Sequence, residues 1–461
     1  KEPMASHLID SLLYMDSYGT PVMREIFDDR SMIQNWLDTE AALAESQAEM
    51  GIIPQEIARE IARKAKVDNL NLENIRKGIV KTGHSLVPTL REFESRCEGG
   101  AGEFIHLGAT TQDIIDTGYI LASKRAFDVI YQDLWEIEEY LLALAEEHKN
   151  TVMAGRTHGQ QALPITFGYK AAIWASEVHR HMQRMKEARK RIFAGQLSGA
   201  VGTLAGFGDR AIELQERVLG KLGLEIPEIS WHASRDRLVE MVGLVAMVAG
   251  TFGKIGNEIY SLQKTEVAEL AEPFTMGQVG SSTMPHKRNP GLSEGMHTLS
   301  KVVKANALLA YEALLQEHER DGAYWKTEHI AIPEAFILTG AILQKAKKAL
   351  NGLVVNKQKM IDNLDILKGL LLSEPVMLML GEKMGKQTAH EVVYEISMKT
   401  FEEGASFKEE LLKDPRVGKH FTEREIAEML DPFRYTGQSP FLAERVVRNI
   451  RAWRLAEKRQ G

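Results

Sequence analysis

Residues 277–297 read Gly-Gln-Val-Gly-Ser-Ser-Thr-Met-Pro-His-Lys-Arg-Asn-Pro-Gly-Leu-Ser-Glu-Gly-Met-His, and they separate two long helical patterns. Gly277 and Gly280 free the backbone, while Pro285 and Pro290 prevent a helix from continuing through the segment. An ordinary solvated connection has little use for adjacent serines, a lysine and an asparagine in so short a span. The composition therefore favours a loop that closes over an anion.

The stretch 280–290, Gly-Ser-Ser-Thr-Met-Pro-His-Lys-Arg-Asn-Pro, resembles the signature of the fumarase/aspartase superfamily. It is most similar to the branch that contains adenylosuccinate lyase and 3-carboxy-cis,cis-muconate cycloisomerase, and companion matches extend over nearly the whole chain. The resemblance implies an all-α, three-domain fold whose central long helices are bundled between subunits of a homotetramer. We expect an N-terminal helical domain at 1–112, the central bundle at 113–365 and a small helical domain at 366–461.

The amino-acid composition limits the kinds of partner that the protein can have. The chain has 461 residues, 44% of them hydrophobic and 26% charged, as in an ordinary soluble protein. A net charge of −7 shows no excess of basic residues of the kind that binds nucleic acid. Cys97 is the only cysteine, which excludes an intrachain disulfide and fits a cytoplasmic location. The most apolar stretch, 241–253, is short for a membrane span and predicts a buried helix, so we expect no membrane partner.

Helical periodicity dominates the middle of the chain. Apolar residues recur in steps of three and four, which predicts the seam of a bundle: Phe127, Ile130, Leu134, Ile137, Leu141 and Leu144. Residues 165–193 and 234–270 contain no proline and would each span roughly 40 Å or more at ~1.5 Å per residue. Such helices need partners along their length, and a bundle shared between subunits supplies them. Capping patterns also predict helix starts at Ser31, Pro164 and Pro333.

Two histidines stand beside glycines. His84 follows Gly83, and its residue type and position allow either a structural or a substrate-contacting role. The resemblance favours substrate contact, although Ser85 stands where adenylosuccinate lyases usually have aspartate. Thr157-His158 lies in a glycine-flanked connection, and histidine is the side chain whose ordinary pKa lies near working pH. The resemblance implies that His158 is the general acid and that Thr157 contacts substrate.

Residues 106–113 read His-Leu-Gly-Ala-Thr-Thr-Gln-Asp. Amides and the dipole at a helix start favour a carboxylate, and Thr110 and Thr111 add hydroxyl donors, although a capped helix without a ligand fits the same pattern. Similarity to the first conserved region of the family implies that Thr110, Thr111 and Gln112 bind a substrate carboxylate. Residues 196–203 form a second glycine-rich connection, in which the resemblance makes Gln196 and Ser198 secondary candidates.

The implied reaction is β-elimination from a succinyl compound, or the reverse addition to fumarate. Removing a proton next to a carboxylate creates a doubly charged species that needs fixed positive charge and aligned donors. Lys287 and Asn289 fit that task, together with a helix beginning near Pro290, and Ser281 is the candidate base. His158 would protonate the leaving amine while Glu294 orients its imidazole. The remaining expected substrate contacts are Ser282, Met284 and Arg320, and no metal or organic cofactor is needed.

Three functions remain open: a carbon–nitrogen lyase similar to adenylosuccinate lyase, a muconate-type cycloisomerase or lyase for another succinyl substrate, and a non-catalytic scaffold. Ser281, Lys287, Asn289 and His158 together weigh against the scaffold. His158 also weighs against a bacterial-type cycloisomerase. Two departures concern the leaving group. Residues 16–21 lack the arginine with which adenylosuccinate lyases usually bind the nucleotide phosphate. Residues 324–329, Tyr-Trp-Lys-Thr-Glu-His, stand where those enzymes show a Ser-Ser and arginine pattern.

Overall fold

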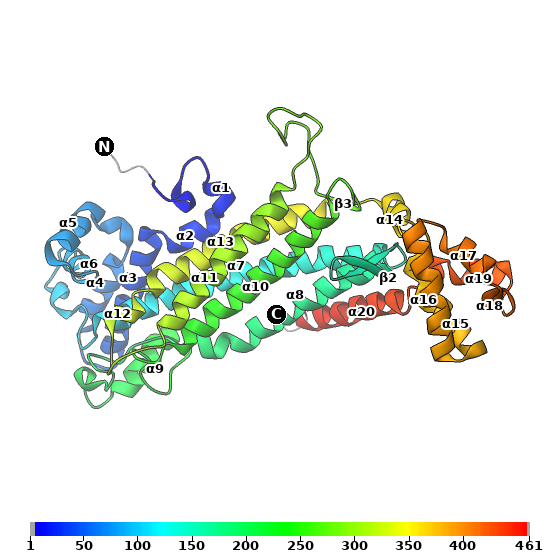
Figure 1. Ribbon diagram of the computed structural model, residues 1–461. Coiled ribbons are helices and arrows are strands. Elements are labelled where there is room, and N and C mark those ends of the chain that lie inside the picture. The colour runs from blue at the N-terminus through cyan, green and yellow to red at the C-terminus, as the bar shows by residue number, and fades with distance from the viewer. Residues whose placement is uncertain (1–4, 459–461) are drawn as a thin grey trace. The chain divides into compact units, whose positions relative to one another are not determined.

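The computed structural model describes residues 5–458, which form helices joined mostly by short connections (Figure 1). The helices of the first hundred residues are α1 (Met15–Tyr18), α2 (Pro21–Phe27), α3 (Asp29–Glu49), α4 (Gln55–Lys64), α5 (Leu72–Thr82) and α6 (Val87–Glu94). The prediction of a helical fold is confirmed. Within the described residues it is interrupted only by four short strands and several single-turn 3-10 helices.

The chain divides into two compact units. Unit 1 contains the residues up to Leu134 together with His181–Gly253 and Gly295–Lys345. Unit 2 contains Trp135–Arg180, Lys254–Glu294 and the residues from Ala346 onward. Five long helices contribute residues to both units: α7 (Thr111–Glu147), α8 (Phe167–Ile192), α10 (Asp236–Leu262), α11 (Gly291–Glu312) and α13 (Glu328–Asn351). The three-domain division at residues 112 and 365 stays a prediction.

The first long helix of unit 1, α3, begins at Asp29, two residues before the predicted cap. Asp28 is the cap, and its carboxylate accepts a hydrogen bond from the Ser31 backbone N–H at 2.7 Å. The predicted cap, Ser31, is therefore wrong, because it already lies within the first turn. The apolar side of α3 packs into a buried cluster with α4 and α6 that includes Leu37, Ile61 and Phe93.

The long helices confirm the predicted seam. Five of its six residues on α7 are 0% exposed and Leu144 is 9% exposed. The predicted helix at 165–193 is α8, and the one at 234–270 is α10, which ends at Leu262 because the chain then turns and forms a strand at Leu270–Ala271. Among the described helices, α10 alone is long and apolar enough to cross a membrane, but 72% of its most apolar window is buried in the protein, as in a core helix.

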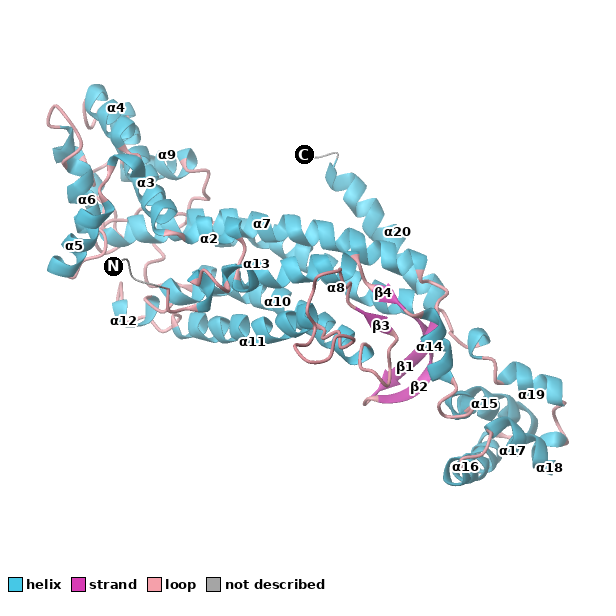
Figure 2. Ribbon diagram, turned by 90° about the horizontal axis from the view of Figure 1, so that it is seen from above, coloured by secondary structure: helices cyan, strands magenta, loops and turns pink. Residues whose placement is uncertain are grey.

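Between α7 and α8 lies a β-hairpin, drawn in magenta in Figure 2. Its strands β1 (Val152–Thr157) and β2 (Gln160–Thr166) are antiparallel, with Val152 opposite Thr166. Pro164 lies inside β2 opposite Ala154, so the prediction that it starts a helix is wrong. A two-stranded sheet has only edge strands, which tolerate a proline that donates no backbone hydrogen bond.

The third predicted helix start, Pro333, is also wrong. α13 begins five residues earlier, at Glu328, and carries Pro333 in its interior. The proline lacks one backbone N–H, so the helix loses a single hydrogen bond near its first turn. Two short helices complete this part of the chain, α9 (Ala211–Lys221) and α12 (Gly322–Trp325).

Unit 2 contains the quoted signature. Strand β3 (Leu270–Ala271) pairs with β4 (Val354–Val355), and a long irregular loop then leads to α11, standing away from that helix in Figure 1. α11 begins at Gly291, as Pro290 predicted. The C-terminal helices are α14 (Lys357–Leu364), α15 (Ser373–Met384), α16 (Lys386–Glu403), α17 (Phe407–Lys413), α18 (Pro415–Gly418), α19 (Glu423–Met429) and α20 (Ser439–Lys458).

Candidate functional site

The signature loop is shaped by its own hydrogen bonds. Ser281 is partly exposed, and its Oγ accepts backbone N–H bonds from Thr283 at 3.3 Å and Met284 at 3.1 Å. The Asn289 amide donates to the Gly280 carbonyl at 2.7 Å and closes the loop on itself. A side chain at Gly280 would place its Cβ 2.1 Å from a backbone oxygen, so only glycine fits this turn.

Several loop side chains are displayed to solvent. Lys287, Ser282 and Met284 are exposed, and no hydrogen bond or ion pair of the Lys287 ammonium occurs within the described residues. The Arg288 guanidinium instead lies over the Phe274 ring, 4.6 Å from its centroid. Lys287 is thus the cation of this loop left available for an anion.

The start of α11 has a carboxylate partner inside the protein. Glu272 accepts backbone N–H bonds from Leu292 at 3.1 Å and Ser293 at 2.5 Å. These are the N–H groups that an anionic ligand at the helix start would need. The N–H groups of this helix end, which were expected to help bind an anion, are therefore already bonded to Glu272. Lys287 and Asn289 remain as the positive charge and the hydrogen-bond donor of the loop.

His158 occupies the turn of the β1–β2 hairpin. It is exposed, has φ 53° and is followed by Gly159, while Thr157 beside it is exposed as well. The strand below is held firmly: Arg156 donates to the fully buried Glu269 carboxylate at 2.7 and 3.1 Å. The hairpin thus holds the backbone of His158 and leaves the imidazole free to meet a substrate or another chain.

Glu294, the residue expected to orient His158, lies exposed in the first turn of α11. Across residues 5–458 neither side chain makes a hydrogen bond in the single chain. The pairing of these two residues stays a prediction.

Thr110 and Thr111 lie at the start of α7 in unit 1. The Thr110 N–H donates to the Asp113 carboxylate at 3.0 Å, an acidic cap three residues into the helix. His84 Nδ1 accepts backbone N–H bonds from Leu86 and Val87 at 3.3 and 3.1 Å, so the neutral ring carries its proton on Nε2. That Nε2 lies 3.5 Å from the Thr111 hydroxyl. The structure therefore places His84 beside Thr111, while their contact with a substrate stays a prediction.

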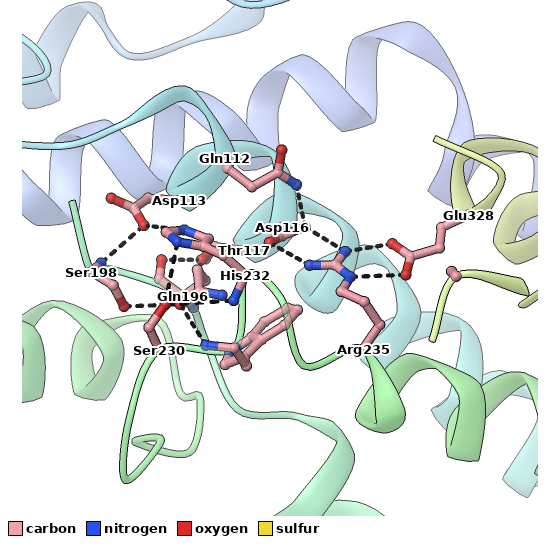
Figure 3. A network of polar contacts seen from close by, with 12 residues as sticks. Gln112, Asp113, Asp116, Thr117, Gln196, Ser198, Ser230, His232, Arg235 and Glu328 are labelled. Atoms are coloured by element: carbon pink, nitrogen blue, oxygen red, sulfur yellow. Dashed lines mark hydrogen bonds and ion pairs between the residues drawn. The ribbon is translucent and has the colours of Figure 1, made fainter. Parts of the chain in front are cut away.

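Asp113 is the centre of a buried cluster beneath this helix start (Figure 3). Its carboxylate accepts hydrogen bonds from the backbone N–H groups of Ser198 and Gly199, both at 2.9 Å, and contacts His232 Nε2 at 3.0 Å. The glycine-rich connection is thereby fixed against α7. Gln196 in that connection is 0% exposed, and its side-chain oxygen accepts from the Ser198 hydroxyl at 2.9 Å.

A second buried cluster joins α7, the residue that precedes α10, and α13. Gln112 donates to Asp116 at 2.6 Å, and Asp116 receives two hydrogen bonds from the Arg235 guanidinium, both 2.9 Å long. Arg235 also binds Glu328, with one bond of 2.9 Å (Figure 3). Burial alone would lower the pKa of Arg235, but the two carboxylates outweigh it and raise that pKa above its ordinary value. Gln112, like Gln196, has the geometry of a supporting residue.

Sequence reasoning missed His232, Arg235 and Glu328. His232 and Arg235 lie in the connection that precedes α10, and Glu328 is the first residue of α13, where charged residues are usually expected to be solvated. No local signal shows that three helix segments 93 to 119 residues apart in sequence converge there. Arg320, which was predicted as a carboxylate contact, is exposed in the connection between α11 and α12.

Comparison with known families decides the assignment. A family model described as "Lyase" matches residues 17–304, and one described as "Adenylosuccinate lyase C-terminus" matches residues 369–446. The chain belongs to the fumarase/aspartase superfamily. The first match contains every predicted site residue except Arg320, and the chain is an enzyme of the lyase class.

Members of this superfamily resemble the chain along its whole length. It is 45% identical over 445 residues to an N-acetyl-S-(2-succino)cysteine lyase of Dickeya dadantii, covering 96% of this chain and 98% of that one. It is 42% identical over 453 residues to an adenylosuccinate lyase of Methanocaldococcus jannaschii, covering 98% and 97%. A 3-carboxy-cis,cis-muconate lactonizing enzyme from Pseudomonas putida has a TM-score of 0.89 at 35% identity, covering 94% and 98%.

Proposed function

We propose that the chain catalyses anti β-elimination from a succinyl compound and releases fumarate. The observation that carries the proposal is the signature loop, which displays Ser281 and Lys287 while its ends are fixed by Asn289 and by Glu272. The names of relatives that are 42–45% identical support a succinyl substrate. No step of this reaction requires an oxidant, a reductant or a metal ion.

The reaction begins at the substrate carbon that lies between the second carboxylate and the carbon that bears the leaving group. The Ser281 alkoxide removes one proton there, and the electron pair is held as an aci-carboxylate that carries two negative charges. Two backbone N–H groups already point at the Ser281 Oγ and stabilise its anion. Lys287 lies six residues away in the same loop and supplies the positive charge that the aci-carboxylate needs.

Collapse of the aci-carboxylate forms the carbon–carbon double bond of fumarate and expels the leaving group with its electron pair. We assign the proton delivered to that group to His158, which has no internal hydrogen-bond partner within the described chain and stands on the fixed hairpin. Thr110 and Thr111, with His84 Nε2 beside them, are the proposed donors for a substrate carboxylate. Glu294 is the proposed orienting partner of His158.

We further propose that the preferred leaving group is the thiol of an N-acylated cysteine, because two relatives, 45% and 42% identical to the chain, are named N-acetyl-S-(2-succino)cysteine lyase. The first arginine near Tyr18 supports this preference. Arg24 is folded inward, since its guanidinium donates to the Met15 carbonyl at 2.9 Å and lies 3.6 Å from Asp16. A nucleotide phosphate would need a displayed cation at that place.

An amine leaving group, as in adenylosuccinate, is the second candidate, favoured by the C-terminal family match at residues 369–446. The structural resemblance to a muconate lactonizing enzyme favours a cyclisation as the third. Fumarate formation should be compared for N-acetyl-S-(2-succino)cysteine, adenylosuccinate and a carboxymuconate. We expect the highest kcat/KM for the thioether. Faster turnover of adenylosuccinate would overturn the thiol preference, and a lactone without fumarate would overturn the elimination.

A further inference from the structure

Three aromatic rings meet at the junction of α7, α12 and α13. The His329 ring is stacked on Tyr119 with centroids 5.0 Å apart and an interplanar angle of 26°. The Trp325 ring also contacts the His329 ring, with centroids 5.0 Å apart and an interplanar angle of 58°. Two of these rings, Trp325 and His329, belong to the segment 324–329 that departs from the adenylosuccinate lyase pattern. The departure has therefore produced a packed aromatic cluster where the sequence pattern expects polar and cationic side chains.

The cluster is uncharged at neutral pH. Burial lowers the pKa of His329 to about 4. The negative charge of Asp116 acts to raise that pKa, and the positive charges of Arg235 and Lys326 act to lower it. Burial raises the pKa of Tyr119 to about 12, and the neighbouring Glu328 and Asp116 act in the same direction. The ammonium of Lys326 lies 5.9 Å from the Trp325 ring centroid, on an exposed side chain. A phosphate dianion would find no buried guanidinium or imidazolium among these rings.

A buried polar atom of the cluster, on Trp325, lacks a hydrogen-bond partner within the described residues. Trp325 is 9% exposed, and its indole Nε1 is a buried donor with no hydrogen bond in the described residues. Gly322 lies beside this nitrogen, since a Cβ added to that glycine would stand 3.6 Å from Trp325 Nε1. A buried N–H without an acceptor is unfavourable, and a neutral carbonyl oxygen can satisfy it.

The cluster is tied to the proposed carboxylate site. Tyr119 lies eight residues beyond Thr111 on α7, which is about 12 Å along the helix at ~1.5 Å per residue. The buried chain from Gln112 through Asp116 and Arg235 ends at Glu328, the residue next to His329. The same helix and the same chain of buried polar contacts therefore position both places.

We propose that Tyr119, Trp325 and His329 form the subsite for the departing half of the substrate, and that this subsite selects an uncharged group bearing an amide carbonyl over a phosphate. The inference rests on the proposed succinyl elimination. Trp325 Nε1 donates to the amide carbonyl of an acylated leaving group, and the neutral rings cover its apolar part. His329 excludes phosphate because it carries no charge at neutral pH.

The test compares two thioethers that differ only in the acyl group, N-acetyl-S-(2-succino)cysteine and S-(2-succino)cysteine, by the kcat/KM of fumarate release. Trp325→Phe keeps the ring and removes the donor, so the preference for the acetylated substrate should fall about tenfold, the loss of one hydrogen bond. Lys326→Met is the matched control and should leave the preference unchanged. An unchanged preference for the acetylated substrate in Trp325→Phe would overturn the inference about the subsite. Fumarate release by the wild type would still support the proposed elimination.

A second variant keeps the test decisive if Trp325→Phe does not fold. His329→Arg restores a fixed cation, so the kcat/KM for adenylosuccinate relative to the acetylated thioether should rise at least tenfold. No rise in a folded His329→Arg protein contradicts the inference. Absence of fumarate from every succinyl substrate with the wild type contradicts the proposed function instead, so the two failures are distinguishable.

Discussion

Asp116 and Arg235 form a two-bond ion pair closed off from solvent, with both nitrogen–oxygen distances 2.9 Å and exposed fractions of 2% and 1%. Glu328 shares the same guanidinium. The pair joins segments 119 residues apart and leaves neither charge in contact with water. Buried pairs of this kind cost much when one partner is removed, because the other is left buried and uncompensated.

Arg235→Leu should therefore lower the free energy of unfolding by about 3–5 kcal/mol. The measurement is the denaturant midpoint followed by circular dichroism. Arg76→Leu is the matched control, since Arg76 pairs with Glu73 on an exposed helix surface, and it should leave the midpoint unchanged. A similar midpoint in Arg235→Leu and the wild type would show that the buried network contributes nothing to stability.

His329 should make stability depend on pH. Its pKa is about 4 in the folded chain and about 6.5 when exposed, so the unfolded chain binds more protons between these values. The free energy of unfolding should consequently fall as the pH drops from about 6.5 toward 4. His329→Gln should flatten that part of the profile. Identical profiles for wild type and variant between pH 4 and 7 would contradict the buried neutral imidazole.

Gly280→Ala should damage activity far more than stability. The added Cβ would lie 2.1 Å from the Lys287 backbone oxygen, which forces the turn carrying Ser281 to open. We expect kcat/KM for fumarate release to fall at least tenfold with little change in the melting temperature, because the loop is largely exposed. Gly291→Ala, whose Cβ meets nothing within 4 Å, is the control that should retain activity.

The site should be completed by more than one subunit. His158 and Glu294 do not bond within a single described chain, and the homotetramer expected from the sequence would supply the partners. Mixing inactive His158→Asn and Ser281→Ala proteins should restore fumarate release after subunit exchange. Each variant alone, taken through the same exchange, is the control. No recovery in proven hybrids would mean that each site is built within one chain.

The helical fold and the positions of the long helices could be predicted, because periodicity and absent prolines are local properties of α7, α8 and α10. The loop at 280–290 could also be recognised from its residues. The hairpin under His158 could not, since Pro164 has the same local preference in a helix start as in an edge strand. The Asp116–Arg235–Glu328 cluster depends on contacts between distant segments, and no window of sequence contains them.

The central claim is that Ser281 initiates an elimination that yields fumarate. Its most direct measurement is the parallel release of fumarate and free thiol from N-acetyl-S-(2-succino)cysteine by the wild type and Ser281→Ala, with Thr283→Ala as the loop control. We expect equal amounts of the two products from the wild type, a kcat lowered about 10²–10⁴-fold in Ser281→Ala with KM little changed, and near-wild-type turnover in Thr283→Ala. Wild-type-like fumarate release by Ser281→Ala, or thiol formed without fumarate, would contradict the account.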